Sequence, residues 1–517
     1  MTWLVTSIPV RNLDHLPRHA DAAWSAGTDA VELRIDPFEG EPDALAAFVA
    51  AHRNRRLIVT CRGPEEGGAF TGTIADRAAL LSAVATAGPA YIDVEATAWA
   101  TSSDIRDAVR SAIAGAGRVG LILSAHSFDH APPDVTAIVR DITAVQDSTV
   151  AKVAYVASDA ADNFPALDTL HNAATPTTAS CMGDAGIVSR VLAKKLGGFA
   201  TYVALTPDAA TAPGQITLDT IKQLYRWDTI DAATRVFGVI GDPVAHSMGP
   251  HLFHRWFAQT GINAVYLPLL VRANGDGLTR WLTGCIKRPW LDVGGFSVTM
   301  PHKQAAAALV GSGVDRAATN IGAVNTIVLR DGRLLGYNTD ARAAAQSIAA
   351  ALGCTAPELD GVTVDVLGTG GAARAVVSGL CDAGAQVTVY GRSPDRTAAV
   401  ADACACTPAA WHDRAASTAD VLVNCTSIGM SPDTDATPMP TADLGCRALV
   451  FDVVYNPMET KLLTDARLAG AATLSGVDMF VRQAAMQFEL WTRHAADVES
   501  GRAVVVERLR RMTGDVS

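Results

Sequence analysis

Residues 206–247, TPDAATAPGQITLDTIKQLYRWDTIDAATRVFGVIGDPVAHS, divide the chain into two halves. Residues 211–215 contain the Pro and Gly that are typical of a loop closing a compact unit. Residues 236–241 form an apolar run that indicates the opening strand of another unit. We therefore expect two units joined end to end. A last helix of the first unit is expected at residues 221–224, and a short polar linker at residues 226–235.

The composition is that of a globular protein with several domains. The chain has 517 residues, of which 49% are hydrophobic and 18% are charged, which is too apolar for a disordered chain. The formal net charge is −11 and the sequence has no sustained basic run. Nucleic acid and an anionic membrane are therefore not expected as partners. No apolar run approaches the length of a membrane-spanning helix.

The nine cysteines are scattered along the chain. The closest pair, Cys404 and Cys406, does not have the CxxC spacing of a metal or redox site. Reduced thiols in a cytosolic protein are the simplest interpretation. The first residues lack the basic and then apolar pattern of a signal peptide. We expect a cytoplasmic protein with no metal, and we take a monomer as its working state of assembly.

The first half alternates short apolar runs with Ala-rich helical stretches. Eight runs at roughly even spacing, with helical patterns between them, predict a (β/α)8 barrel. A doubly wound sheet is the alternative fold. The expected strands are residues 3–7, 30–34, 57–61, 91–94, 120–124, 151–156, 178–181 and 200–204.

Polar side chains recur at the expected C-terminal ends of these strands, where the chemistry of α/β barrels gathers. Lys152 is the most informative, because a lysine in an apolar strand must lose its water or find partners, and either tends to shift its pKa. An edge-strand lysine is the structural alternative. A desolvated lysine near arginines can be neutral enough to form a Schiff base with a ketone. The other strand-end candidates are Glu32, Arg34, Arg62, Glu66, His126, Arg190 and Gln215.

These motifs, taken together, identify a family for the first half. The runs ELRID, TCRGPEEGG and SAHSF, the lysine strand, MGDAG–SR and APGQ occur in the order found in type I 3-dehydroquinate dehydratase. The half resembles that family over nearly its whole length. The resemblance implies a barrel in which Lys152 forms an imine with the substrate C3 carbonyl. His126 then removes a proton from C2, water leaves from C1, and hydrolysis frees 3-dehydroshikimate.

The resemblance also implies roles for the neighbouring side chains. Arg190 is expected to hold the substrate carboxylate, and Glu66 falls near a mobile lid. Thr211 keeps a hydroxyl where many members of the family have serine. His130 lies on the same loop as His126 but does not match the catalytic position. The residues expected around the ring hydroxyls are Glu32, Arg34, Arg62 and Gln215, with Ser7 as a further member of this shell.

The second half carries the motifs GDPVAHSMGP, GGFSVTMPHK, GAVNT and GYNTD, followed by VLGTGGAA. This order predicts two α/β lobes with a cleft between them. We expect the barrel at residues 1–225, a substrate-binding lobe at 236–340, a Rossmann-like lobe at 341–475 and C-terminal helices at 476–517.

A Gly-rich turn between a strand and a helix lets backbone N–H groups approach a pyrophosphate. Gly368, Gly370 and Gly371, with Ala372, have this placement, and a tight strand–helix turn is the structural alternative. The next strand ends in Arg392 and Ser393, with Arg396 nearby. Arginine there suits the 2′-phosphate of NADP, where NAD sites place Asp or Glu. Ordinary surface charge is the alternative for these arginines.

The second half resembles shikimate dehydrogenase over about 270 residues, on the PHK, GAVNT, GYNTD and terminal G-x-x-M-x-x-x-Q motifs. The resemblance implies that Lys303 and Asp340 flank the reacting C3 oxygen. A helix N-cap is the structural interpretation of Asp340, and it is compatible with the catalytic one. Residues expected around the substrate are Ser247, Thr299, Asn325, Tyr455 and Gln483. Residues expected near the nicotinamide are Thr426, Gly476 and Met479.

Gly249 departs from the family pattern, because it stands where a second serine usually serves the carboxylate. Family members that act on quinate can carry glycine there, so quinate is an alternative substrate of the second half. A ligand-sensing regulator built on these folds is a further interpretation, and the retention of Lys152, His126, Lys303 and Asp340 argues against it. The expected function is dehydration of 3-dehydroquinate followed by reduction of 3-dehydroshikimate to shikimate with NADPH.

Overall fold

The computed structural model describes residues 1–354 and 358–513, and it consists of two compact units. Unit 1 comprises residues 1–235 and 263–284. Unit 2 comprises residues 236–262 and the chain from residue 285 onward.

Unit 1 is built on eight parallel strands whose order is β7-β6-β5-β4-β3-β2-β1-β8. Each strand lies beside its neighbour in sequence, and β8 returns to β1, so the predicted barrel is confirmed and the doubly wound sheet is wrong. Between β7 and β8, the Phe199 N–H donates to the Thr177 carbonyl at 2.7 Å. The strands are β1 (Trp3–Pro9), β2 (Ala30–Arg34), β3 (Leu57–Thr60), β4 (Tyr91–Glu95), β5 (Gly120–Ser127), β6 (Val150–Val156), β7 (Thr177–Met182) and β8 (Ala200–Ala204).

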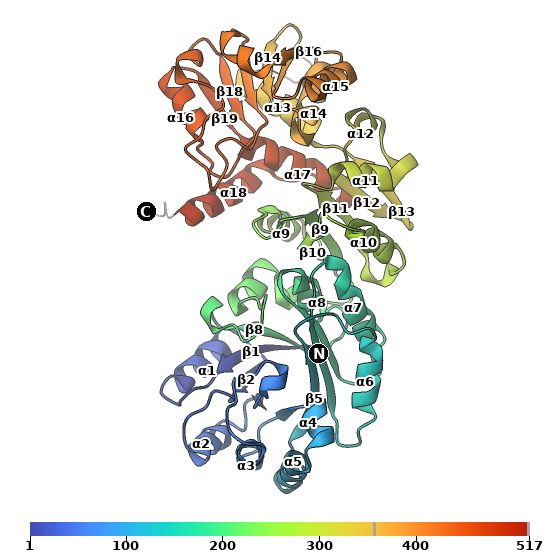
Figure 1. Cartoon of the computed structure of the whole chain (residues 1–517), viewed down its shortest axis with the longest axis vertical. Coiled ribbons are helices and arrows are strands. Elements are labelled where there is room, and N and C mark those ends of the chain that lie inside the picture. Colours follow the sequence, from blue (N-terminus) through green and yellow to red (C-terminus); the bar gives the residue numbers. More distant parts are fainter. Residues whose placement is uncertain (355–357, 514–517) are drawn as a thin grey trace. The chain divides into compact units, whose positions relative to one another are not determined.

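The strands are buried on both faces because helices cover the outside of the barrel (Figure 1) and side chains fill its interior. One interior cluster contains Val5, Ile58, Ile122 and Tyr202 from four different strands. The covering helices are α1 (Leu16–Ser25), α2 (Pro42–Ala51), α3 (Ile74–Thr86), α4 (Ala96–Thr101), α5 (Ser103–Ala116), α6 (Val135–Thr143), α7 (Phe164–His171) and α8 (Ile187–Leu192).

The segment predicted as a polar linker packs on unit 1. Trp227 and Ile230 are each only 2% exposed, and the Trp227 carbonyl accepts a hydrogen bond from Lys194 Nζ at 2.8 Å. The helix expected at residues 221–224 is a π-helical turn, Thr220–Leu224. Residues 263–284, with β10 (Ala264–Leu270) and most of α10 (Gly277–Ile286), are also part of unit 1.

Unit 2 contains a mixed sheet in which β9, β11, β12 and β13 are successive neighbours. The pair β9–β11 is parallel, whereas β11–β12 and β12–β13 are antiparallel. The strands are β9 (Arg235–Gly241), β11 (Val293–Val298), β12 (Thr326–Arg330) and β13 (Arg333–Tyr337). Its helices are α9 (Gly249–Thr260), α11 (Lys303–Val310) and α12 (Arg316–Ile321).

The second sheet of unit 2 is fully parallel and has the order β16-β15-β14-β17-β18-β19. The strand order reverses between β14 and β17, which is the switch point of a Rossmann-like fold, as predicted. The strands are β14 (Thr363–Leu367), β15 (Gln386–Gly391), β16 (Thr407–Ala410), β17 (Val421–Asn424), β18 (Leu449–Asp452) and β19 (Ala472–Ser475). The helices are α13 (Asp340–Leu352), α14 (Gly371–Asp382), α15 (Pro394–Cys404), α16 (Lys461–Leu468), α17 (Gly476–Thr492) and α18 (Val498–Thr513).

Within the described residues, no helix has both the length and the apolar character needed to cross a membrane.

A buried ion pair joins β14, a central strand of the parallel sheet in unit 2, to the residues before β18. Arg447 Nη1 lies 2.6 Å from Asp365 Oδ2, and both side chains are at most 2% exposed. Substituting Arg447→Ala leaves a buried carboxylate without a counter-charge, so we expect the free energy of unfolding of unit 2 to fall by about 3–5 kcal/mol. The exposed pair Arg467–Glu459 supplies the control, since Arg467→Ala should cost about 0–1 kcal/mol. Urea unfolding measures both, and equal losses would contradict the assignment.

Candidate active sites

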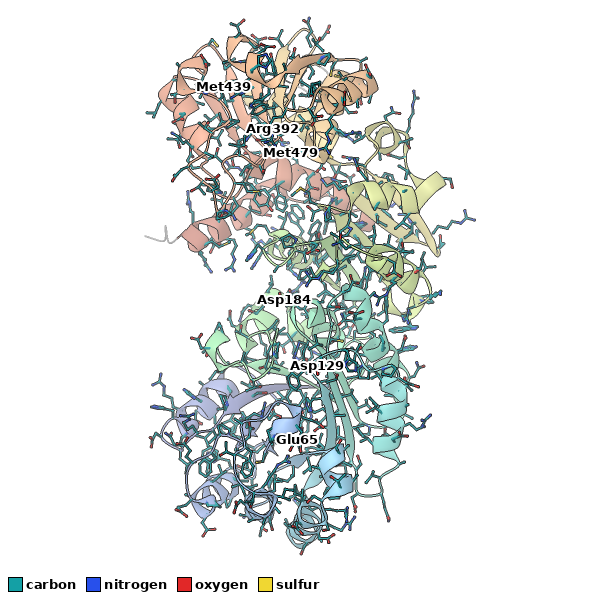
Figure 2. The ribbon with its side chains drawn as sticks, viewed as in Figure 1. Glu65, Asp129, Asp184, Arg392, Met439 and Met479 are labelled. Atoms are coloured by element: carbon teal, nitrogen blue, oxygen red, sulfur yellow. The ribbon has the colours of Figure 1, made fainter. Side chains whose placement is uncertain are left out.

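The nine predicted substrate and catalytic residues of the first half line one cavity of unit 1. The cavity lies at the C-terminal ends of the barrel strands, where Glu65, Asp129 and Asp184 mark the loops after β3, β5 and β7 (Figure 2). The predicted residues on its wall are Ser7, Glu32, Arg34, Arg62, His126, Lys152, Arg190, Thr211 and Gln215. Glu66, Phe128 and Tyr202 also line this cavity.

Lys152 extends from β6 into the barrel and is 6% exposed. Its Nζ donates to Asp93 Oδ2 at 2.8 Å and to Glu32 Oε1 at 3.3 Å. Burial alone lowers the pKa of Lys152, but the two carboxylates outweigh it and the pKa is raised. The expectation that this lysine is neutral because of desolvation and nearby arginines is therefore wrong for the free protein. The ammonium is paired and must lose a proton before it can act as a nucleophile.

Asp93 joins Lys152 to Arg62. Arg62 Nη2 lies 2.9 Å from Asp93 Oδ1, and Arg62 Nη1 lies 3.1 Å from Glu95 Oε1. Although burial favours the neutral acid, Arg62 and Lys152 hold the pKa of Asp93 far below its usual range. Sequence reasoning missed Asp93 and Glu95. The available signal was two acidic residues two positions apart in the apolar strand YIDVE, which places both on one face of the strand.

His126 is held by Glu66 through two hydrogen bonds. Its Nδ1 is 2.8 Å from Glu66 Oε2, and its backbone N–H donates to the same oxygen at 2.9 Å. Burial, Arg62 and Lys152 lower the pKa of His126 well below its usual value, so the imidazole is neutral near pH 7. Burial raises the pKa of Glu66 to about 7. A neutral imidazole with one nitrogen fixed by a carboxylate is suited to act as a general base.

Arg190 is a buried cation without a counter-charge in the described part of the chain. It is 3% exposed, its Nη1 donates to the Tyr202 carbonyl at 3.3 Å, and its Nε has no partner there. Burial lowers the pKa of Arg190 to about 10. A buried guanidinium without a counter-charge attracts an anionic group of a ligand, such as a carboxylate, into the cavity. Arg34 differs, because its guanidinium is already paired with Asp36 at 2.9 and 3.1 Å.

The remaining barrel residues form a short hydrogen-bonded chain at the cavity wall. Ser7 Oγ donates to Glu32 Oε2 at 2.6 Å, and Gln215 Nε2 is 3.5 Å from Ser7 Oγ. The Thr211 N–H donates to Gln215 Oε1 at 2.8 Å. These contacts orient the amide of Gln215 with its NH₂ group toward Ser7.

Lys303 and Asp340 meet in unit 2. Lys303 Nζ lies 2.6 Å from Asp340 Oδ2, and their side chains are 19% and 9% exposed. Lys303 is the first residue of α11 and Asp340 is the first residue of α13, whose N-cap is Thr339. The N-cap interpretation of Asp340 is therefore wrong by one position. A lysine and a carboxylate at hydrogen-bond distance can move a proton to or from a bound oxygen.

Asn325 connects Thr339, the residue before Asp340, to α17. Its Nδ2 donates to Thr339 Oγ1 at 3.0 Å and to Gln483 Oε1 at 3.4 Å. Gln487, which was not predicted, donates from Nε2 to the Asn325 carbonyl at 3.2 Å.

The other predicted substrate residues have separate local contacts. Ser247 Oγ accepts from the Gly249 N–H at 3.1 Å, and the Thr299 N–H donates to the Ile240 carbonyl at 2.9 Å. Tyr455 stacks on Phe480 with ring centroids 5.0 Å apart. Their convergence on one ligand stays a prediction.

The turn between β14 and α14 fits a dinucleotide phosphate. Gly368 has φ +116°, a conformation that favours glycine, and Gly370 caps α14. A Cβ at Gly370 or Gly371 would have no atom within 4 Å, so the start of the helix is open. Backbone N–H groups at such a helix N-terminus attract phosphate oxygens.

The end of β15 fits the phosphate of NADP. Arg392 and Arg396 are exposed and Ser393 is half-buried, and no carboxylate ends the strand. Arg392 and Met479 belong to the same unit (Figure 2), and Met479 is 4% exposed on α17. The Thr426 hydroxyl donates a hydrogen bond to Asn424 Oδ1 at 2.7 Å, which orients its side chain. At Gly476 a Cβ would come within 2.2 Å of the Val453 carbonyl, so glycine there has a packing reason.

Comparison with known families divides the chain in the same order as the fold. Residues 4–232 match type I 3-dehydroquinase. Residues 239–327 match the shikimate dehydrogenase substrate binding domain, and residues 476–506 match the shikimate 5′-dehydrogenase C-terminal domain. Residues 363–438 match the coenzyme F420-dependent NADP oxidoreductase family.

Individual relatives agree with these matches. The chain is 34% identical over 505 residues to the chloroplastic bifunctional 3-dehydroquinate dehydratase/shikimate dehydrogenase of Arabidopsis thaliana, covering 93% of this chain and 80% of the relative. It is 40% identical over 286 residues to the NADP⁺ shikimate dehydrogenase of Methanosarcina acetivorans, covering 53% and 99%. A solved shikimate dehydrogenase in complex with NADP⁺ aligns with a TM-score of 0.50 at 30% identity, covering 54% and 97%.

The Glu66–His126 pair makes a prediction for a titration. Above about pH 7 the Glu66 carboxylate accepts the Nδ1 proton of His126 and leaves Nε2 unprotonated. Below that pH Glu66 gains the proton while the imidazole stays neutral. NMR of ¹³C-labelled histidine should therefore show the His126 signal changing near pH 7 because of Glu66, and Glu66→Gln should remove that change. An unchanged midpoint in Glu66→Gln would mean that the imidazole itself titrates there.

Proposed function

Because the chain belongs to the family of bifunctional 3-dehydroquinate dehydratase/shikimate dehydrogenases, we propose that it dehydrates 3-dehydroquinate in unit 1 and reduces the resulting 3-dehydroshikimate to shikimate in unit 2. The observation that carries the first activity is the buried Lys152 ammonium, paired with Asp93 and Glu32 in the same cavity as His126. The second activity is supported by the Lys303–Asp340 pair in the half of the chain that is 40% identical to a shikimate dehydrogenase.

In the dehydration, the substrate carboxylate forms an ion pair with the Arg190 guanidinium, which has no counter-charge among the described residues. Lys152 gives up a proton, its nitrogen attacks the C3 carbonyl carbon, and water leaves to form the iminium. The iminium withdraws electrons from C2, so that neutral His126 can remove the C2 proton. His126, now an imidazolium, returns this proton to the departing C1 hydroxyl. Water then hydrolyses the imine, releasing 3-dehydroshikimate and the Lys152 amine.

In unit 1 the ring hydroxyls are bound by the polar wall of the cavity. Glu32, Ser7 and Gln215 form one hydrogen-bonded group on this wall. Thr211 holds the amide of Gln215, and Arg62 approaches from the side of Asp93. Arg34 also contributes to binding the ring hydroxyls, and its ion pair with Asp36 holds its guanidinium in position.

In the reduction, Lys303 and Asp340 bind the C3 oxygen, and the pair supplies the proton that this oxygen gains. NADPH, when bound, supplies the hydride. The substrate is held by Ser247, Thr299, Asn325, Tyr455 and Gln483. Gly368, Gly370, Gly371 and Ala372 hold the pyrophosphate, Arg392, Ser393 and Arg396 hold the 2′-phosphate, and Thr426, Gly476 and Met479 lie beside the nicotinamide.

We assign residues 1–225 to the dehydratase, 236–340 to the substrate lobe, 341–475 to the NADP lobe and 476–517 to helices that complete the substrate lobe. Quinate, the alternative suggested by Gly249, is not favoured, because the Arabidopsis and Methanosarcina relatives of this half are named as shikimate dehydrogenases. A cytoplasmic location is supported by the nine cysteines, all of which are free thiols.

Borohydride reduction tests the imine. In the presence of 3-dehydroquinate it should attach the substrate irreversibly to Lys152, with the adduct located by mass spectrometry of a digest. Lys152→Ala should lose both the adduct and dehydration. The control is Lys195→Ala, which removes another buried lysine of the same unit. An adduct that persists in Lys152→Ala would exclude this lysine as the nucleophile.

Lys303→Ala tests whether the two sites are independent. We expect reduction of 3-dehydroshikimate to fall by about 100-fold or more, because the proton donor pair is broken. Dehydration should be unchanged, because the dehydratase residues lie in unit 1. Lys461→Ala, at an exposed lysine of unit 2 that pairs with the buried Asp465, is the matched control and should retain both activities. Loss of dehydration in Lys303→Ala would show that the halves depend on each other.

A further inference from the structure

Tyr202 lies beside the reactive lysine, although no motif in the sequence draws attention to it. It is the central residue of β8, and its ring packs in the interior cluster of the barrel with Val5, Ile58 and Val150. Lys152 Nζ lies 3.9 Å from the centroid of this ring. The ring therefore contacts the nitrogen that forms the proposed imine, and it fixes one side of that nitrogen.

The hydroxyl of Tyr202 is a buried donor without a partner in the described part of the chain. Buried polar groups are normally hydrogen-bonded, so an orphaned phenol in a cavity wall indicates that a ligand completes it. Burial raises the pKa of Tyr202, and the phenol keeps its proton at neutral pH.

The carboxylates near this hydroxyl already have other donors. Asp93 accepts from Lys152, Arg62 and Ser124. Glu32 accepts from Ser7, Thr60 and Lys152. The phenol is thus a donor beside Lys152 Nζ that remains available to an incoming oxygen.

We propose that the Tyr202 hydroxyl carries protons between the Lys152 nitrogen and the substrate carbonyl oxygen while the imine forms. This inference rests on the proposed lysine–imine dehydration. Conversion of the ammonium and the ketone to an iminium and water moves two protons from nitrogen to oxygen. Tyr202 donates its phenolic proton to the oxygen as the C–N bond forms and regains a proton from the nitrogen. It repeats this exchange as the C–O bond breaks, so both protons are transferred and no external acid or base is consumed. The reverse sequence serves imine hydrolysis.

The test is the single-turnover rate of imine formation in the full chain, measured by quenching with borohydride at timed intervals. Tyr202→Phe keeps the ring against Lys152 and removes only the hydroxyl. We expect imine formation to slow by about 100-fold, the lower end of what a positioned proton donor contributes. Substrate affinity should stay close to that of the parent, and imidazole buffer should restore part of the rate by acting as a small acid.

Tyr155→Phe is the matched control. It removes a buried hydroxyl from the same barrel, but that hydroxyl donates to the Asp162 carbonyl at 2.8 Å and Tyr155 does not line the cavity. Its imine formation should match the parent. Oxidation of shikimate by unit 2 reports the concentration of active chain in every variant.

Each outcome is decisive. An unchanged rate in Tyr202→Phe overturns the relay, and so does a slower rate that is accompanied by an equal loss of affinity or that buffer does not rescue. If the parent chain itself forms no borohydride adduct, the lysine–imine mechanism of the proposed dehydratase is contradicted. That outcome is distinct from a failure of the Tyr202 relay alone.

Discussion

The barrel site depends on one constraint, which is that the Lys152 ammonium is buried and must be neutralised inside the barrel. Two carboxylates form ion pairs with this ammonium, and each carboxylate also accepts hydrogen bonds from side chains of neighbouring strands. The result is a hydrogen-bonded network to which six consecutive strands each contribute a side chain: Ser7, Glu32, Thr60, Asp93, Ser124 and Lys152. Such a network holds the nucleophile in place before substrate arrives. It also explains why the free lysine is protonated, and why proton transfer has to accompany imine formation.

The second site pairs the same residue types in a different setting. Lys303 and Asp340 begin two helices, and their side chains are more exposed than Lys152 and Asp93. A carboxylate in the first turn of α13 is favoured by the partial positive charge of the helix N-terminus. Next to the pair, Asn325 donates hydrogen bonds to Gln483 and to Thr339, the residue before Asp340. The pair lacks the larger carboxylate network around Lys152, because the Lys303 ammonium is less buried and pairs with a single carboxylate.

Much of the fold could be predicted because its strands are apolar runs separated by helical patterns, and that signal is local. The candidate residues in motifs such as PHK and APGQ could be named for the same reason. Asp93, Glu95 and Gln487 were missed because their meaning comes from neighbours distant in sequence: Asp93 contacts Lys152 across 59 positions and Gln487 contacts Asn325 across 162. The protonation of Lys152 was misjudged because the sequence revealed its burial and the arginines but not the carboxylates of the adjacent strands. The expected linker packs on unit 1 because Trp227 is buried, which its polar surroundings in the sequence concealed.

The central claim is that one chain carries out two successive reactions at two separate sites. The most direct test supplies purified chain with 3-dehydroquinate and NADPH alone and follows both the consumption of NADPH and the identity of the product. The account predicts that shikimate forms with one NADPH consumed per 3-dehydroquinate, after a lag in which 3-dehydroshikimate accumulates if reduction is the slower step. Mixing a chain inactivated at Lys152 with one inactivated at Lys303 should restore the two-step conversion of 3-dehydroquinate to shikimate, because the intermediate can diffuse between chains. Consumption of NADPH without 3-dehydroshikimate as an intermediate, or no consumption at all, would contradict the account.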